Sequence, residues 1–144
     1  MADADDRKGS RMATRREINP WTWSEALGFV QAVESRDVGR IVHLAGQTSA
    51  DENGRLLHPG DMAAQVMTAL DNVETVLAGA GLELADVTRL NYYTTDVDAF
   101  FAVQKTHLAP RLRQAGCRSC GVLLGVARLA HPQMLVEIEA TAVG

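Results

Sequence analysis

Apolar and polar side chains alternate most regularly near the end of the chain, in LVEIEATAV (135–143). Because side chains alternate between the two faces of a strand, Glu137 and Glu139 point the same way. The opposite face carries only small or apolar side chains: Val136, Ile138, Ala140 and Ala142. This pattern predicts a strand with one face in the core and two carboxylates on the other.

A helical period follows Asp61. Apolar residues recur there at spacings of three and four: Met62, Val66, Leu70, Val73 and Leu77. The spacing predicts a helix with one apolar stripe, and the Asp61 carboxylate can cap its first turn. Gly79 and Gly81 should end this helix, because glycine reaches the left-handed conformation without steric cost.

The segment VTRLNYYTTDV (87–97) is rich in β-branched and aromatic residues and predicts a strand. A second helix is expected to start near Asp98 and to carry Phe100, Val103 and Leu108. Pro110 should kink or end it, since proline cannot donate a hydrogen bond to the preceding turn.

The remaining strands are expected at 29–36 and 40–49, joined by a tight turn around 37–39, and at GVLLGVARL (121–129). Residues 14–18 are a candidate for one more short strand. Residues 1–14 are polar, charged and without period, which is typical of a disordered N-terminal extension. We therefore expect a single domain at 15–144.

The order of these elements predicts an α+β domain whose two helices lie on one face of a six-stranded mixed sheet. The second face of the sheet, which carries Glu137 and Glu139, then needs water or a partner surface. Periodicity leaves two interpretations of these glutamates open. They could form a solvated outer face, or one of them could act as a general acid or base in a partly dry site.

The composition of the chain excludes some classes of function. The chain has 144 residues and a formal net charge of −4, which argues against a nucleic-acid partner. No stretch approaches the ~20 apolar residues that cross a bilayer, so no membrane association is expected. With two cysteines and no apolar signal segment, the sequence predicts a cytoplasmic protein.

The spacing of the two cysteines in CRSC (117–120) suggests a metal or redox site, but the context does not favour either. Structural zinc normally needs four ligands, and a second cysteine pair is missing. The four histidines show no ligand spacing. A redox pair would be expected at a helix N-terminus, whereas these cysteines precede a strand. We expect plain thiols and no metal.

Several segments together resemble the RidA (YjgF-like) family of reactive-intermediate deaminases. They are LGFVQAV (27–33), LAGQTS (44–49), AAQVMTALDNVETVLAGAGLELADV (63–87), TTDVDAF (94–100) and GVARL…LVEIEATAV (125–143). The resemblance implies a chorismate-mutase-like fold and a homotrimer with a central barrel of sheets. It also implies small-molecule sites at the subunit interfaces, where a partner would cover the second face of the sheet.

The resemblance further implies an activity that uses neither a metal nor an organic cofactor. Family members hydrolyse reactive enamine or imine acids, such as 2-aminoacrylate, to a keto acid and ammonia. In such members a glutamate positions or activates the water, and here it falls on Glu137. The residues that line the pocket fall on Phe29, Gly46 and Gln104, and Phe29 lacks the phenol hydroxyl of the tyrosine form.

The family's carboxylate-binding arginine has two possible counterparts here. Deaminating members read like ARSCVEVARL, and an alignment without a gap places Gly121 at the arginine and Leu123 at the usual cysteine. A gapped alignment keeps Arg118 but inserts three residues into a strand. Alternation favours the ungapped version, because such an insertion turns the arginine to the opposite face unless a bulge absorbs it.

Three hypotheses follow for the function. The first is a RidA-like trimer whose standard 2-imino-acid activity is weak or absent because Gly121 replaces the arginine. The second is an active 2-imino-acid deaminase that uses Arg118. The third is a non-catalytic trimer that binds a ligand or a regulatory partner. The acidic chain gives little support to the endoribonuclease role that is sometimes attached to this family.

Overall fold

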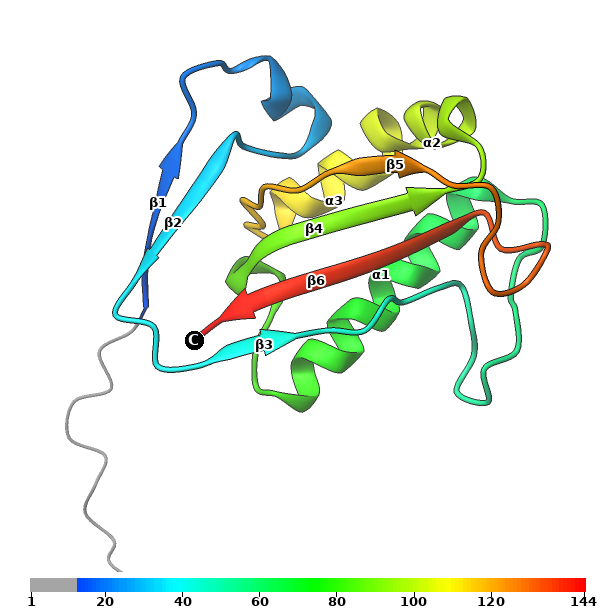
Figure 1. Ribbon diagram of the computed structural model, residues 1–144, viewed down its shortest axis with the longest axis horizontal. Coiled ribbons are helices and arrows are strands. Elements are labelled where there is room, and N and C mark those ends of the chain that lie inside the picture. Colours follow the sequence, from blue (N-terminus) through cyan, green and yellow to red (C-terminus); the bar gives the residue numbers. More distant parts are fainter. Residues whose placement is uncertain (1–12) are drawn as a thin grey trace, which may run out of the picture.

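The computed structural model describes residues 13–144 (Figure 1). Most of the expected N-terminal extension, residues 1–12, lies outside the described residues. Strand β1 (Thr14–Ile18) begins at the last residue of the expected extension. The candidate strand at 14–18 is confirmed.

The main sheet has four strands in the order β3-β6-β4-β5. Strand β6 (Val136–Val143) pairs antiparallel with β3 (Ile41–His43) on one side and with β4 (Val87–Thr94) on the other. Strand β5 (Leu123–Gly125) pairs parallel with β4. The sheet is therefore mixed, and the predicted α+β class is confirmed.

The six predicted strands do not form one sheet. Strand β2 (Ala32–Arg36) pairs with β1 in a separate two-stranded sheet, which extends to one side of the molecule in Figure 1. The backbone N–H groups of Gly39 and Arg40 both donate to the Gly144 carbonyl, 2.9 Å away. These bonds direct the chain from β2 to the end of β6, so β2 and β3 do not form the hairpin that the sequence suggests.

Helix α1 (Met62–Gly79) matches its prediction closely. Asp61 accepts a hydrogen bond from the Ala64 N–H at 3.0 Å and so caps the first turn. The apolar stripe is fully buried at Val66, Leu70, Val73 and Leu77. Each buried side chain of this size contributes about 1.5–3 kcal/mol relative to an exposed one, so the stripe holds α1 against the sheet.

The second helical segment passes through Pro110 instead of ending there. It runs as α2 (Val97–Val103), a π-helical turn η3 (Gln104–Leu108) and α3 (Ala109–Gln114). Proline removes a donor and clashes with the carbonyl of the preceding turn, and a π turn relieves that conflict by widening the helix. The wider turn begins at Gln104, one of the expected ligand-binding residues.

The helices cover one face of the main sheet, and no described element covers the other (Figure 1). On β6, Val136, Ile138, Ala140 and Ala142 are buried against the helices. Glu137 and Glu139 are half-buried on the open face, as the alternation predicts. Two short 3₁₀ helices, η1 (Trp23–Leu27) and η2 (Leu84–Asp86), complete the described fold. No helix within residues 13–144 is long and apolar enough to span a membrane.

Candidate functional site

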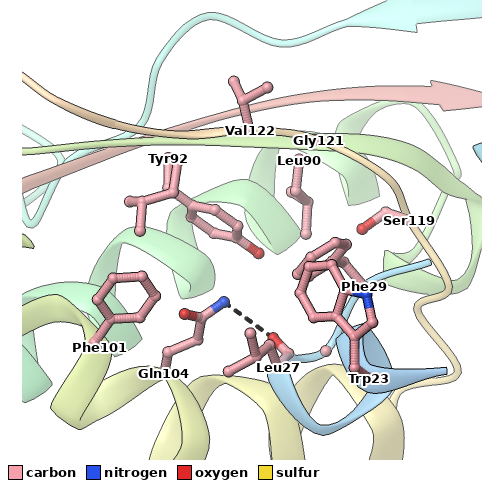
Figure 2. Close-up of a pocket in the computed structure, with 12 residues that line it drawn as sticks. Trp23, Leu27, Phe29, Leu90, Tyr92, Phe101, Gln104, Ser119, Gly121 and Val122 are labelled. Atoms are coloured by element: carbon pink, nitrogen blue, oxygen red, sulfur yellow. Dashed lines mark hydrogen bonds between the residues drawn. The ribbon is translucent and has the colours of Figure 1, made fainter. Parts of the chain in front are cut away.

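An apolar cavity of about 210 Å³ lies on the helix side of the main sheet, between η1, β4, β5 and the α2–η3 segment (Figure 2). Its wall is rich in aromatic rings: Trp23, Phe29, Tyr92 and Phe101. The rings of Trp23 and Phe29 meet edge to face, with centroids 5.7 Å apart. Such pairs stabilise a fold by more than the burial of their apolar area alone. The contact therefore holds η1 and the segment that follows it in place as one side of the cavity. We call this site the aromatic cavity.

Three more of the expected ligand-binding residues line the aromatic cavity, namely Gln104, Gly121 and Leu123. The Gln104 amide N–H donates to the Leu27 carbonyl at 3.1 Å, which ties the π turn to η1. Its amide oxygen is buried and has no hydrogen-bond partner in the part of the chain that the structure describes. The structure thus brings four of the seven expected site residues, these three and Phe29, together in one cavity.

Gly121 occupies a position where a side chain does not fit. A Cβ atom built on Gly121 would lie 1.7 Å from the Leu90 carbonyl oxygen, which belongs to the backbone of β4. The segment before β5 approaches β4 closely here: the Leu90 N–H donates to the Cys120 carbonyl at 2.9 Å. Only glycine allows this approach, so an arginine at this position would require the two segments to separate.

A second site lies on the open face of the same sheet. It is a cleft of about 270 Å³ lined by Gly46, Tyr93, Val126, Leu129, Glu137 and Glu139, and we call it the carboxylate cleft. Tyr92 and Tyr93 are neighbours on β4 and project to opposite faces. Tyr92 therefore belongs to the aromatic cavity and Tyr93 to the cleft.

Gly46 provides the space that the Glu137 side chain occupies. A Cβ atom at residue 46 would lie 2.1 Å from Glu137 Oε1 and 2.7 Å from its Cδ. The two expected residues therefore belong to one local arrangement, in which the glycine backbone forms the floor under the carboxylate. No described residue donates a hydrogen bond to Glu137. Its oxygens remain free for water or for a ligand.

The neighbouring carboxylate of Glu139 is satisfied within the chain. The Tyr93 hydroxyl donates to Glu139 Oε1, and the Asn91 amide donates to the same oxygen at 3.0 Å. These bonds, that from Tyr93 first, hold the pKa of the Glu139 carboxyl below its ordinary value. The bond to Glu139 also raises the pKa of Tyr93. Of the two glutamates, Glu139 is fixed as an acceptor and Glu137 is available.

Arg118 lies in neither of these two sites. Its guanidinium donates two hydrogen bonds to Glu17 of β1, at 2.8 and 2.9 Å, and lies 3.4 Å from a carboxylate oxygen of Glu25 in η1. This paired geometry suits a guanidinium and a carboxylate. The hydrogen bond from Arg118 is the main cause that lowers the pKa of Glu17. The residue thus joins the segment before β5 to β1 and η1.

The cysteines follow the expectation for plain thiols in their surroundings. Cys117 is buried, and burial raises the pKa of its thiol to about 11, so it stays protonated. Cys120 donates weakly to the Thr88 carbonyl at 3.4 Å. Within residues 13–144, no group of three or more His, Cys, Asp or Glu side chains could hold a metal ion.

Sequence reasoning assigned no role in the site to Trp23, Tyr92, Tyr93 or Phe101. Trp23 does pack on Phe29, yet it is 62% exposed and lines the aromatic cavity. Strand alternation contained a usable signal, because it places the two adjacent tyrosines on different faces. It did not indicate that a cavity lies beside η1, since η1 meets the π turn at Gln104 only in the folded chain.

Comparison with known proteins agrees with this fold. Residues 23–144 match the family described as Endoribonuclease L-PSP. The 2-iminobutanoate/2-iminopropanoate deaminase of Escherichia coli (strain K12) is 33% identical over 119 residues, which cover 80% of this chain and 86% of that protein. The 3-aminoacrylate deaminase RutC of Acinetobacter baylyi is 30% identical over 110 residues, with coverages of 76% and 84%.

A crystal structure of YyfB from Yersinia pestis, a Rid family protein of unknown function, is also similar. It superposes with a TM-score of 0.80 at 39% identity and covers 90% of this chain and 98% of that one. The family match, these two deaminases and this structure confirm the resemblance that the sequence motifs indicate. The chain belongs to the Endoribonuclease L-PSP family, which includes the RidA (YjgF-like) imine deaminases.

Proposed function

We propose that this protein hydrolyses reactive enamines or imines to carbonyl compounds and ammonia in the cytoplasm, without a metal or an organic cofactor. The observation that carries the proposal is the Glu137 carboxylate, which lies over Gly46 with no donor from the described chain. A free, half-buried carboxylate can hold a water molecule and accept its proton. The deaminase names of the two relatives support the same class of reaction.

The reaction consumes one water molecule, and Glu137 is ionised again at its end. The water oxygen bonds to the carbon of the C=N group while Glu137 accepts a proton from the water. The nitrogen receives the electron pair of the C=N π bond and takes this proton from Glu137, which gives a carbinolamine. Glu137 then accepts the O–H proton of the carbinolamine and passes it to the nitrogen, so the C=O bond forms, the C–N bond breaks and ammonia leaves. In this scheme the Tyr93–Glu139 pair holds one wall of the cleft, because both groups already satisfy each other.

A homotrimer would bring the two sites together. The aromatic cavity and the carboxylate cleft lie on opposite faces of one sheet, so the cavity of one subunit can meet the cleft of the next only across an interface. Val122 and Leu124 are 46% and 47% exposed along β5 and its approach, and apolar surface of this kind favours such an interface. Light scattering should then give a mass three times that of one chain.

Standard 2-imino acids are expected to be poor substrates. Their carboxylate needs a cation, and no charged side chain of residues 13–144 lines the aromatic cavity. Gly121 cannot carry an arginine in this backbone, and Arg118 already binds Glu17 and Glu25. These contacts favour the first hypothesis over the one in which Arg118 binds the substrate.

The test compares Glu137→Gln with Glu52→Gln, a matched change at an exposed loop glutamate. Imines are generated in the assay by an amine oxidase or an amino-acid oxidase, and ammonia release is followed with and without the protein. We expect Glu137→Gln to lower the acceleration by about 10²–10⁴-fold, the usual contribution of a general base, and Glu52→Gln to leave it unchanged.

Two results would contradict the proposal. If no imine is hydrolysed faster with the wild-type protein, the chain is not a deaminase, and the non-catalytic ligand-binding hypothesis takes its place. If Glu137→Gln retains full acceleration, the reaction does not use this carboxylate.

A further inference from the structure

Besides the buried Gln104 amide oxygen, the lining of the aromatic cavity contains a second polar group without a partner among the described residues, the Tyr92 hydroxyl. Tyr92 is only 8% exposed, yet its hydroxyl makes no hydrogen bond with any described residue. Figure 2 shows the Tyr92 ring projecting from β4 toward the π turn, with its oxygen in the space between Gln104 and Phe29. A buried tyrosine hydroxyl usually finds a partner, so this one is left for a molecule in the cavity.

The hydroxyl stays neutral and can donate. Burial raises the pKa of Tyr92 well above its ordinary value. The ring itself is held in place, because its centroid lies 5.3 Å from that of the buried Phe100. A neutral donor on a fixed ring suits an uncharged acceptor, such as an imine nitrogen or a carbonyl oxygen.

The other residues that line the aromatic cavity disfavour a charged ligand. The other polar side chains that line the cavity, Gln104 and Ser119, are uncharged and buried, and the remainder is apolar or glycine. Moving a carboxylate into such a site without a cation costs several kcal/mol. The volume of about 210 Å³ is smaller than that of pockets for drug-sized ligands, roughly 300–1,000 Å³, and suits a molecule of one ring with a short side chain.

We infer that the aromatic cavity binds a small, apolar, carboxylate-free molecule whose single polar group meets the Tyr92 hydroxyl. This inference rests on the proposed function for its reaction: the substrate is then an imine derived from an apolar amine, and not an imine derived from an amino acid. Water adds to its C=N carbon, the C–N bond breaks, and the products are an aldehyde and ammonia. Tyr92 is a substrate-binding residue in this scheme, distinct from Glu137.

Binding alone tests the ligand class, independently of catalysis. The probes are 2-phenylethanol and 3-phenyllactate, which share the phenyl ring, the CH₂ group and the hydroxyl but differ by a carboxylate. Titration calorimetry on the wild-type protein should give at least tenfold tighter binding for 2-phenylethanol. Equal affinities, a preference for 3-phenyllactate or no binding of either probe would overturn the inference.

Tyr92→Phe isolates the hydroxyl. Because the hydroxyl has no partner within residues 13–144, its removal should leave the melting temperature unchanged. It should weaken 2-phenylethanol binding about threefold to tenfold, the value of one neutral hydrogen bond. Ethylbenzene, which lacks the probe's hydroxyl, serves as the matched control and should bind wild type and variant equally. An equal loss for both probes would indicate a change in packing and contradict the role of Tyr92.

A second variant reverses the selectivity. Phe101 lies at the margin of the cavity and is 45% exposed, so Phe101→Arg adds a cation there at little expected cost to folding. It should improve 3-phenyllactate binding relative to 2-phenylethanol. Val76→Arg places the same charge on α1, away from the aromatic cavity, and should change neither affinity. If both variants bind 3-phenyllactate better, general charge attraction explains the effect and the inference fails.

Catalysis separates this inference from the proposed function. The two substrates are the imines that an amine oxidase makes from 2-phenylethylamine and an amino-acid oxidase makes from phenylalanine. Faster hydrolysis of the first supports both proposals. Faster hydrolysis of the second, with Glu137 required, keeps the proposed function and overturns the ligand class. If neither imine is hydrolysed but 2-phenylethanol still binds selectively, the ligand class stands and the hydrolysis does not.

Discussion

The aromatic cavity and the carboxylate cleft occupy opposite faces of one sheet and use adjacent tyrosines in opposite ways. In the cleft, the Tyr93 hydroxyl donates to Glu139, so this pair is complete within the chain. In the cavity, the Tyr92 hydroxyl has no partner among the described residues. The cleft thus offers a free carboxylate beside a satisfied pair, whereas the cavity offers apolar walls and one free neutral donor. In the proposed function, this contrast separates the chemistry, on the open face, from the recognition of the substrate, on the helix face.

Glycine has a different function in each site as well. A side chain at Gly121 would collide with the backbone of β4, which cannot move without breaking the pairing of β4 with the segment before β5. A side chain at Gly46 would collide with the end of the flexible Glu137 side chain. The same substitution at these two positions should therefore affect different properties of the protein.

The largest effect on stability is expected for Gly121→Ala. The added methyl group cannot be accommodated beside the Leu90 carbonyl, so the strands must separate, and we expect a loss of about 3 kcal/mol in the free energy of unfolding. Urea denaturation followed by circular dichroism measures it. A loss below about 0.5 kcal/mol would show that the segment before β5 can move away from β4, and an arginine at this position would then be feasible.

Gly46→Ala should instead reduce activity while sparing the fold. The methyl group displaces the Glu137 carboxylate by about an ångström, and misplacement of this size can cost on the order of 10²-fold in rate. Imine hydrolysis and the melting temperature are measured on the same preparation. Unchanged hydrolysis would contradict the role of Gly46 as the floor under Glu137, and would weaken the assignment of chemistry to the open face.

The smallest effect is expected for Arg118→Gln, which tests whether this arginine belongs to either site. Its contacts with Glu17 and Glu25 are at the surface, so their loss should cost about 0.5–1 kcal/mol at pH 7 and leave imine hydrolysis unchanged. Arg118 lowers the pKa of Glu17, so this contribution is present above the ordinary carboxyl pKa of about 4.3 and disappears as the pH falls through the lowered pKa.

Urea denaturation at pH 7 and at low pH measures this dependence, and wild type and Arg118→Gln should become equally stable in acid. A loss of imino-acid hydrolysis in the variant would restore the hypothesis that Arg118 holds a substrate carboxylate.

Much of the fold was predictable because local patterns decide it. In α1 and β6, the spacing of the apolar residues indicates which face of the element becomes buried. The failures occur where hydrogen bonds distant in sequence decide the outcome. Strand β2 pairs with β1 instead of β3, and the Gly39 and Arg40 N–H groups donate to the distant Gly144 carbonyl.

The candidate site divides in the same way. The sequence by itself determined the family and the face of β6 on which Glu137 lies. It also showed that a glycine, Gly121, stands where related deaminases have an arginine. Only the tertiary structure decided that Arg118 meets Glu17, 101 residues away, and that η1 closes a cavity over Tyr92. The physical reason is that spacing along a strand fixes the face to which a side chain points. The partners on that face come from segments that only folding brings together.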